Sequence, residues 1–353
     1  MSRQFYLELA ATGRRVPIAT HLVLHERPDP EAILVDGARL AGVMAETADR
    51  FHSPLALPIM DLTLEKELLL TTLGLGGDER AKYHFEGLPP ASAAADLRTR
   101  LDPRSLPRIA ANLAALTEIA GEGRLTPIGM SIGPFSLVTK LMVDPITAIY
   151  LAGSGLGPED DETVAQLDAL LELGELVIEA SCAAQIDAGA KAVFVCEPAA
   201  NIVYFSPKQL REGSDSFKRY VIEPNLRLAD LIRQGGADLI FHDCGELVPE
   251  MISAFAALRP VMLSLGSSVR LWEIEPQVPK DVVLYGNLPT KKFYSDEEIP
   301  LSAVREMADE IAKRLTALQH PFIIGSECDV LSMPGYEKVI MEKVLQFCGR
   351  APR

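Results

Sequence analysis

The sequence predicts an α/β protein that folds as a TIM (β/α)8 barrel with a helical N-terminal extension. About seven or eight short apolar runs alternate with helical patterns, which is typical of parallel βαβ units. The runs are unalternating, as expected for strands covered on both faces. A chain of 353 residues with 48% hydrophobic content can bury one large core, so the pattern favours a barrel over a doubly wound sheet. We expect one domain over residues 1–353, with residues 1–55 as the extension and residues 56–353 as the barrel.

The N-terminal segment has mixed patterns. Residues 15–19 could form a first strand. Residues 29–34 have the pattern of a short helix, with Asp29 as its N-cap and Pro30 at its first position. We interpret residues 1–55 as a helical layer that covers one end of the core.

The rest of the chain repeats a unit of apolar run, polar residue and helix. The first unit is the run 55–60, which ends at Asp61 and is followed by a helical pattern. Runs typical of buried strands cover residues 55–60, 126–132, 190–196, 237–241, 260–266, 281–287 and 321–324. Helical patterns cover residues 62–68, 107–120, 145–151, 163–188, 217–234, 249–258, 301–318 and 334–348.

Particular residues mark where these elements begin and end. Residues 87–107 are rich in Pro, Ala and Arg and predict a loop with a short helix. Gly133-Pro134 forces a turn after the run 126–132, and Ser136 could cap the helix that follows. Pro224 interrupts the helical pattern 217–234, and Gly235-Gly236 ends it.

Polar side chains stand where the apolar runs stop. In a TIM barrel the carboxyl ends of all strands meet on one face, where active sites are built. Polarity must resume at a strand end in any case, so some of these residues only cap loops or helices. The strand-end residues are Asp61, Ser131, Glu197, His242, Ser264, Asn287, Glu327 and Cys328.

His242, Cys244 and Cys328 form the most specific candidate site. Side chains i and i+2 of an extended chain face the same way, so His242 and Cys244 can point into one cavity. With Cys328 from another strand end, they supply one nitrogen and two sulfur ligands, which suits zinc with a fourth position open. The alternative is that each cysteine is a small buried hydrophobe and that the histidine is a hydrogen-bonded core residue. Cys244 and Cys328 are far apart in the sequence, so only the fold can bring them together.

Composition narrows the compartment and the partners. The formal net charge of -15 argues against nucleic acid or an anionic membrane as a partner. No stretch approaches the ~18 uninterrupted apolar residues of a membrane-spanning helix, and the first residues lack a signal-peptide core. Five cysteines in a long chain are a poor disulfide framework. We therefore expect a protein of the reducing cytoplasm.

Several motifs together resemble the uroporphyrinogen decarboxylase superfamily. His-x-Cys-Gly at His242 and the late Cys328 resemble its methyltransferase branch, the zinc enzymes that move a methyl group from a methylated corrinoid protein to coenzyme M or tetrahydrofolate. True decarboxylases carry an arginine-rich W-x-M-R-Q-A-G-R motif near the N-terminus, and here only Arg14-Arg15 comes near it. The motifs are Gly133-Pro134-Phe135-Ser136-Leu137, Glu197-Pro198 with Ser206-Pro207, His242-Asp243-Cys244-Gly245, Gly286-Asn287 and Cys328.

The resemblance implies a zinc site and roles for further residues. His242, Cys244 and Cys328 would be the zinc ligands, with His242 and Cys244 also counted as catalytic. Glu197 would be a catalytic carboxylate that helps to manage the N5 proton of tetrahydrofolate. The residues expected to contact a cofactor are Asp61, Asn201, Ser264 and Asn287.

The fourth zinc ligand stays open. Relatives can use a Glu in the strand after the His-x-Cys motif, but residues 262–268 contain no carboxylate. Glu246, Glu327, water or substrate could fill the position, and Asp243 and Glu327 could orient the ligands. The resemblance also implies two partners: a corrinoid protein that docks at the barrel mouth, and a small-molecule methyl acceptor, either tetrahydrofolate or a thiol such as coenzyme M.

Two other functions compete with this one. A metal-free decarboxylase-like lyase would need cationic groups at the pocket, whereas the strand ends are acidic or neutral. A non-catalytic zinc- or corrinoid-binding accessory protein is favoured only by the missing fourth carboxylate.

Overall fold

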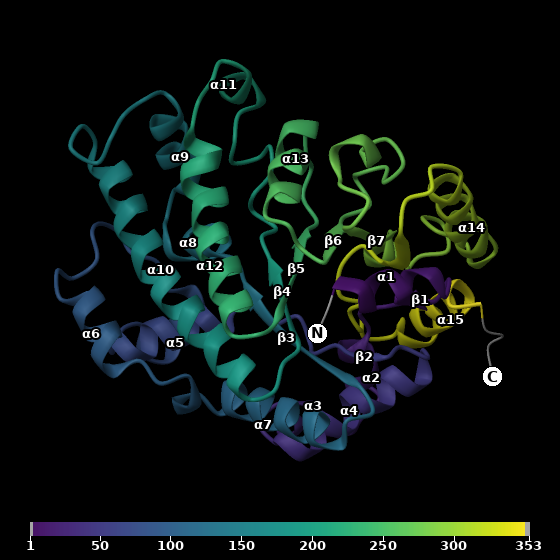
Figure 1. Cartoon of the computed structure of the whole chain (residues 1–353). Helices are drawn as coiled ribbons and strands as arrows, with labels where there is room; N and C mark the ends of the chain where they lie inside the picture. Colours follow the sequence, from purple (N-terminus) through teal and green to yellow (C-terminus); the bar gives the residue numbers. More distant parts are fainter. Residues whose placement is uncertain (1–2, 350–353) are drawn as a thin grey trace.

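A curled sheet of eight parallel strands organises the computed structural model, which describes residues 3–349 (Figure 1). The strand order is β1-β8-β7-β6-β5-β4-β3-β2, so each of the later strands pairs with the next one along the chain. Within the described residues the sheet is open between β1 and β2, which makes a half-barrel consistent with the predicted TIM barrel. The strands are β1 (Arg15–Val16), β2 (Leu55–Ala56), β3 (Thr126–Ile132), β4 (Ala192–Cys196), β5 (Asp238–Asp243), β6 (Met262–Leu265), β7 (Val283–Leu288) and β8 (Phe322–Ser326).

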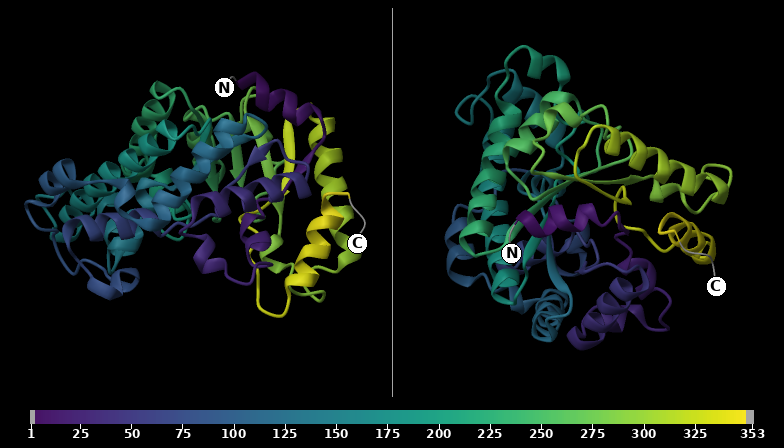
Figure 2. Two further views of the ribbon diagram at one scale, coloured as in Figure 1. Left: turned by 90° about the horizontal axis from the view of Figure 1, so that it is seen from below. Right: turned by 45° about the vertical axis from the view of Figure 1, so that its right-hand side comes forward.

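Helices cover the outside of the sheet, as Figures 1 and 2 show. The longest, α10, packs on β3 and β4 as well as on neighbouring helices. The α-helices are α1 (Arg3–Ala11), α2 (Thr20–Leu24), α3 (Pro30–Ile33), α4 (Gly37–Arg50), α5 (Leu64–Leu73), α6 (Ala93–Arg100), α7 (Pro107–Glu122), α8 (Pro134–Leu141), α9 (Pro145–Gly153), α10 (Glu162–Asp187), α11 (Pro207–Arg211), α12 (Glu223–Gln234), α13 (Pro249–Ala257), α14 (Leu301–Ala317) and α15 (Glu337–Phe347). Shorter helical turns are η1 (Gly77–Lys82), η2 (Pro103–Ser105), η3 (Lys218–Ile222), η4 (Glu275–Gln277) and η5 (Thr290–Lys292).

The two-residue period of a strand divides the core into an inner and an outer layer. Along β4, Ala192, Phe194 and Cys196 belong to the cluster inside the barrel. Val193 and Val195, which alternate with them, belong to the cluster between the sheet and the outer helices. The unalternating apolar run is thus explained by burial of both faces.

The N-terminal segment is part of the barrel. β1 pairs in parallel with β8. The sheet therefore begins within residues 1–55, so the predicted boundary between extension and barrel at residue 55 does not coincide with the start of the sheet. In α1, the Arg3 guanidinium donates hydrogen bonds to the backbone oxygens of Arg259, Pro260 and Asp281 at 2.8–2.9 Å. These carbonyls precede β6 and β7, so α1 lies across the amino-terminal end of the barrel.

Two helix starts differ from the sequence analysis. Ser136 is not a cap, because α8 already begins at Pro134 after the N-cap Gly133; its hydroxyl instead accepts from the Ala199 amide at 3.0 Å. Asp29 stands at the N-cap position of α3, but its side chain makes no cap hydrogen bond. Its carboxylate instead accepts a hydrogen bond from the exposed Arg39 side chain, at 2.7 Å.

The first βα unit is shorter than predicted. β2 ends at Ala56. The carbonyl oxygen of the next residue, Leu57, accepts a hydrogen bond from the Thr20 hydroxyl and not from a neighbouring strand. Helix α5 begins only at Leu64, because Asp61 accepts from both the amide and the hydroxyl of Thr63 and makes a turn there.

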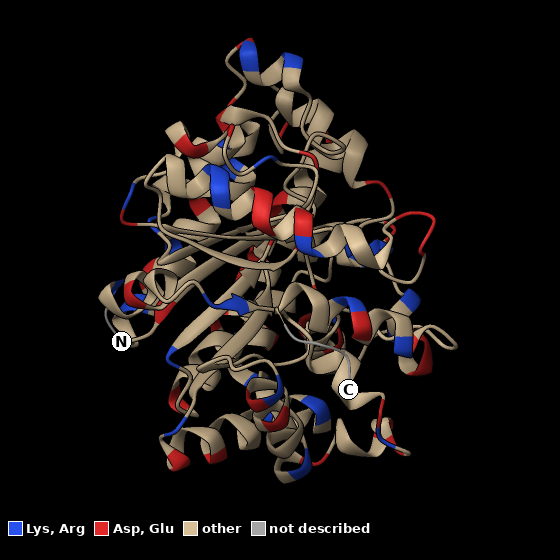
Figure 3. Ribbon diagram, turned by 90° about the vertical axis from the view of Figure 1, so that its right-hand side faces the viewer, with Lys and Arg blue, Asp and Glu red and all other residues tan. Residues whose placement is uncertain are grey.

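Acidic and basic residues lie mostly on the outer helices and loops (Figure 3). None of the helices within residues 3–349 has the length and apolarity that crossing a bilayer requires.

Candidate metal centre

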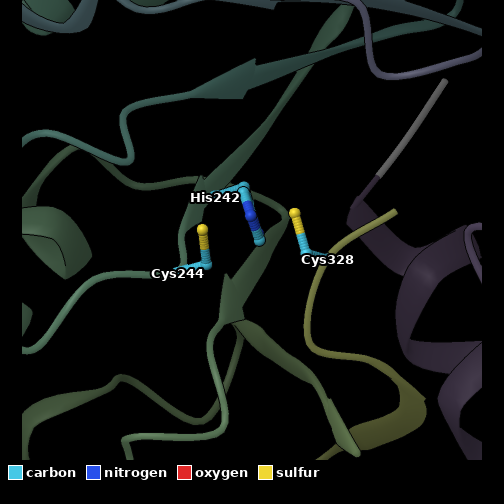
Figure 4. A group of neighbouring side chains, drawn as sticks. All are labelled: His242, Cys244 and Cys328. Atoms are coloured by element: carbon cyan, nitrogen blue, oxygen red, sulfur yellow. The ribbon is translucent and has the colours of Figure 1, made fainter. Parts of the chain in front are cut away.

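His242, Cys244 and Cys328 meet at the carboxyl ends of β5 and β8. A nitrogen of the imidazole and the two Sγ atoms all lie within 4.8 Å of one another. Figure 4 shows the three side chains turned toward one another. His242 points inward because it follows the inner-layer residue Ile240 by two positions in β5. The structure therefore brings together all three predicted metal ligands.

One ring nitrogen of His242 contacts a neighbouring side chain, and the other makes no hydrogen bond within the described residues. Its Nδ1 lies 2.8 Å from the hydroxyl oxygen of Ser264, which is completely buried in β6. Its Nε2 is buried and has no hydrogen-bond partner in the described part of the chain. A proton on Nδ1 bonded to Ser264 leaves the Nε2 lone pair available, which is the usual arrangement of a metal-bound histidine. The residues thus fit a zinc ion by their chemistry.

The thiols of Cys244 and Cys328 have pKa values shifted in opposite directions. The hydrogen bond from the Cys328 thiol, opposed by burial and helped by His242, lowers the pKa of Cys244. The same bond raises the pKa of Cys328. Cys244 is therefore the thiolate of the pair, and a thiolate is the form that binds metal.

Lys291 is a site residue that the sequence analysis missed. It follows β7, in η5. Burial disfavours the charge of its amine, but the neighbouring Cys244 and Cys328 outweigh burial and raise its pKa. The site therefore contains a cation that can balance the thiolate.

Glu327 ties three loops together beside the thiols. Its Oε2 accepts from the amide of Ser267 at 3.3 Å and from its hydroxyl at 2.5 Å. Its Oε1 accepts from the Lys291 amide at 3.2 Å. Both oxygens are engaged, which suits the predicted role of orienting the site.

Close backbone packing fixes Cys244. A Cβ on Gly266 would lie only 2.7 Å from the Cα of Cys244, so only glycine allows the chain after β6 to pass here. Asp243 is fully buried, accepts from the Gly245 amide at 2.6 Å and has a pKa raised by burial. The turn that carries Cys244 is thereby fixed from both sides.

Glu197, predicted to be catalytic, follows β4 and is completely buried, and its side chain lies at the amino-terminal end of α8. Its Oε1 accepts from the Phe135 amide at 3.1 Å and from the Asn225 side chain at 2.8 Å, and its Oε2 accepts from the Ser136 amide at 2.8 Å. Burial raises its pKa. A Cβ on Gly133 would come within 2.1 Å of its carboxyl carbon, which explains the glycine before Pro134. Glu197 thus anchors α8, and contact with a substrate would require one of these bonds to open.

Asp61, expected to contact a cofactor, forms an ion pair with Arg108 at 2.7 Å. It lines a cavity of about 270 Å³ together with His21, His25 and Met60. The Sδ of Met60 lies 3.6 Å from the Sγ of Cys328, so this cavity adjoins the metal centre.

The other residues expected to contact a cofactor bond within the protein. Ser264 supports His242, as described above. Asn287 is nearly buried and donates to the carbonyl oxygens of Gly266 and Val269 at 2.8 and 2.6 Å. Asn201 donates to the Pro198 carbonyl at 2.6 Å within its own turn. Their positions support the loops around the centre.

Comparisons with known proteins place this geometry in context. A family model, Uroporphyrinogen decarboxylase (URO-D), matches residues 36–341. Among solved structures, a methyltransferase from Methanosarcina mazei superposes with a TM-score of 0.68 at 14% sequence identity, over 99% of this chain and 98% of the other. At that identity the likeness concerns the fold. A search of curated proteins finds no match.

Proposed function

Because the chain belongs to the uroporphyrinogen decarboxylase (URO-D) family, we propose that it is a zinc-dependent methyltransferase of that superfamily. The donor is a methylated corrinoid protein, and the acceptor is tetrahydrofolate or a thiol such as coenzyme M. The observation that carries the proposal is the group of His242, Cys244 and Cys328, with ligand atoms within 4.8 Å and an unpartnered Nε2. The methyltransferase of similar fold supports the same choice.

The protein's own residues prepare the centre. His242, Cys244 and Cys328 would hold the zinc, with Ser264 fixing the imidazole and Lys291 offsetting thiolate charge. Zinc bound there would supply a Lewis acid that keeps a thiol acceptor ionised near neutral pH. The cavity at Asp61 and Met60 opens beside this centre, and we assign it to the acceptor.

In the transfer step, the acceptor sulfur or N5 nitrogen forms a bond to the methyl carbon. The bond between that carbon and cobalt breaks, and its electron pair stays with the corrinoid of the partner protein. Tetrahydrofolate must also lose its N5 proton. Glu197, the carboxylate proposed from the sequence for this proton, could accept it only by exchanging one of its three hydrogen bonds.

The test is turnover of free methylcobalamin, followed by its absorbance, with tetrahydrofolate and with coenzyme M in separate reactions. We expect the zinc-loaded protein to demethylate it with one of the two acceptors and His242→Ala to be inactive. A protein that binds zinc but turns over neither acceptor, even with a corrinoid protein, would be an accessory protein. Absence of zinc would instead favour the lyase.

A further inference from the structure

We propose that a second cavity, between α5, η1 and α8, binds an oxyanion that carries at least two negative charges. This Lys66 cavity has a volume of about 580 Å³, and its walls include the cations Lys66, Arg80 and Lys140. None of its lining residues belongs to the metal centre. The anion site itself does not depend on the proposed methyl transfer, whereas a folate as the source of the anion, considered below, rests on it.

Lys66 is the central observation. Only 5% of this residue is exposed, although it carries a charged amine. The amine donates one hydrogen bond, to the Ala81 carbonyl at 3.1 Å, and an ammonium group has three donors. No carboxylate forms an ion pair with it anywhere in residues 3–349. Buried lysines normally have an anionic partner.

Arg80 and Lys140 add two more cations to the same cavity. Neither forms an ion pair within the described residues, and the Nε of Arg80 is buried without a hydrogen-bond partner. Burial first and the charge of Lys140 second lower the pKa of Lys66 to about 8. Three unpaired cations around one cavity repel each other, and an anion between them would remove that repulsion.

The remaining lining includes two acidic residues and the amino-terminal end of a helix. Glu67 and Asp78 also line the cavity, but no ion pair within the described chain joins either of them to the three cations. Helix α5 begins at this cavity after Thr63, whose side chain makes no cap hydrogen bond. The dipole of this ten-residue helix adds a weak attraction at its amino-terminal end, which the Asp61 carboxylate bonded to the amide and hydroxyl of Thr63 partly offsets.

The recognised group is a doubly charged oxyanion, which can be a phosphate monoester or a pair of carboxylates. The volume of about 580 Å³ leaves room for a larger molecule around that group. Thr63 at the cavity edge follows Met60 by three residues, so their Cα atoms are at most about 11 Å apart. Since Met60 touches Cys328, a glutamyl tail of a folate acceptor is one source of the carboxylates.

Isothermal titration at low ionic strength, with inorganic phosphate and with γ-glutamylglutamate as separate probes, tests the site. We expect at least one probe to bind, and binding to weaken as salt is added. Lys66→Met and Lys140→Met should each weaken it about tenfold or more, as expected for a hydrogen bond or close contact to a charged group. The probe that binds more tightly shows whether the site recognises a phosphate group or a pair of carboxylates.

Lys82→Met is the matched control, because Lys82 lies in the same η1 but is exposed and is not among the residues that line the cavity. Its one ion pair within residues 3–349 is with Glu79, at 3.9 Å. The variant should bind the probe as the unmodified protein does. Among the described residues the side chain that donates to the Ala81 carbonyl is that of Lys66 and not that of Lys140, so Lys140→Met separates anion binding from the support of η1 by Lys66. Absence of binding by both probes would overturn the proposal. Equal binding by the unmodified protein and a folded Lys140→Met variant would do so too.

Discussion

The Nδ1 of His242 lies 2.8 Å from the hydroxyl oxygen of Ser264, its register partner on the adjacent strand β6. This contact occupies Nδ1, while the buried Nε2 has no hydrogen-bond partner among the described residues. Sequence reasoning placed Ser264 at a strand end and expected it to contact a cofactor. In the structure its hydroxyl contacts His242, the predicted metal ligand, and this contact depends on the pairing of β5 with β6.

Ser264→Ala should weaken zinc binding without abolishing it. The substitution removes the partner of Nδ1 and leaves the three ligands in place, and loss of such a partner typically reduces metal affinity about 10- to 100-fold. Competition with a chromophoric chelator measures the change. Ser268→Ala is the control, because the hydroxyl of the exposed Ser268 makes one hydrogen bond within residues 3–349, to the Gly245 carbonyl at 2.8 Å, and none to His242. Equal affinity in both variants would show that the contact does not tune the site.

His242→Ala and Cys328→Ser should lose most of the bound zinc and remain folded. The three ligands lie at strand ends of a large core, so the barrel does not depend on the metal. Elemental analysis should give about one zinc per chain for the unmodified protein and far less for either variant. Cys348→Ser, a half-buried thiol outside the group, should keep its zinc. Full occupancy in both ligand variants would refute the site.

Features that depend on the local sequence pattern could be predicted, and features that depend on how distant segments meet could not. The spacing of His242 and Cys244 predicts a shared direction because a strand alternates. The barrel prediction then brings Cys328 to the same face, although the sequence alone leaves this open. Lys291 could not be predicted, because it lies beyond its strand in a turn whose path depends on Glu327. β1 (Arg15–Val16) lies within residues 15–19, which the sequence analysis gave as a possible first strand. Its two residues are too few for a periodic signal, so its pairing with β8 could not be predicted.

Glu197 shows a different limit. A buried carboxylate at a strand end has the same sequence pattern whether it meets a substrate or a helix terminus. The glycine at position 133, where a Cβ would collide with Glu197, is the one local signal for close packing. Its meaning becomes visible only when β3 and β4 are paired.

Glu197→Gln should therefore destabilise the protein more than it slows turnover. An amide replaces an acceptor that faces two backbone amides of α8, and an unsatisfied buried donor costs about 1–3 kcal/mol. Urea unfolding measures the loss, and turnover is compared per folded protein. Glu212→Gln is the control, because its exposed contact with Lys208 at 3.9 Å contributes little. Unchanged stability with strongly reduced turnover would instead support the catalytic role.

Cys244 should be the more reactive thiol of the metal-free protein. The hydrogen bond from Cys328 lowers its pKa below the ordinary 9.0, so the thiolate persists at pH 7. Alkylation by iodoacetamide, mapped by peptide mass spectrometry, should modify Cys244 already near neutral pH. Cys328→Ala removes the main cause of the shift and should move the profile to higher pH. An ordinary thiol profile for Cys244 in the unmodified protein would contradict this reading.

Glu65 should make the stability of the protein fall as pH rises. Its Oε1 accepts from Ser131 and Ser181 at 3.0 and 3.1 Å, whereas its Oε2 is buried without a partner. Burial raises its pKa from 4.5 to about 7. Between these two values the native carboxyl keeps a proton that the unfolded chain has lost. Its contribution is therefore fully present below the unfolded pKa and is lost as pH rises through the folded pKa, by on the order of 3 kcal/mol.

Urea unfolding at pH 5 and pH 8 tests this assignment. Glu65→Gln cannot ionise, so its free energy of unfolding should decline less between the two pH values. Asp329, whose pKa burial also raises to about 7, accounts for a remaining decline in the same direction. Glu118→Gln, an exposed change on α7, should keep the full pH dependence. If Glu65→Gln declines as steeply as Glu118→Gln, the carboxyl is ionised in the native protein, and its unpartnered oxygen must then be satisfied in another way.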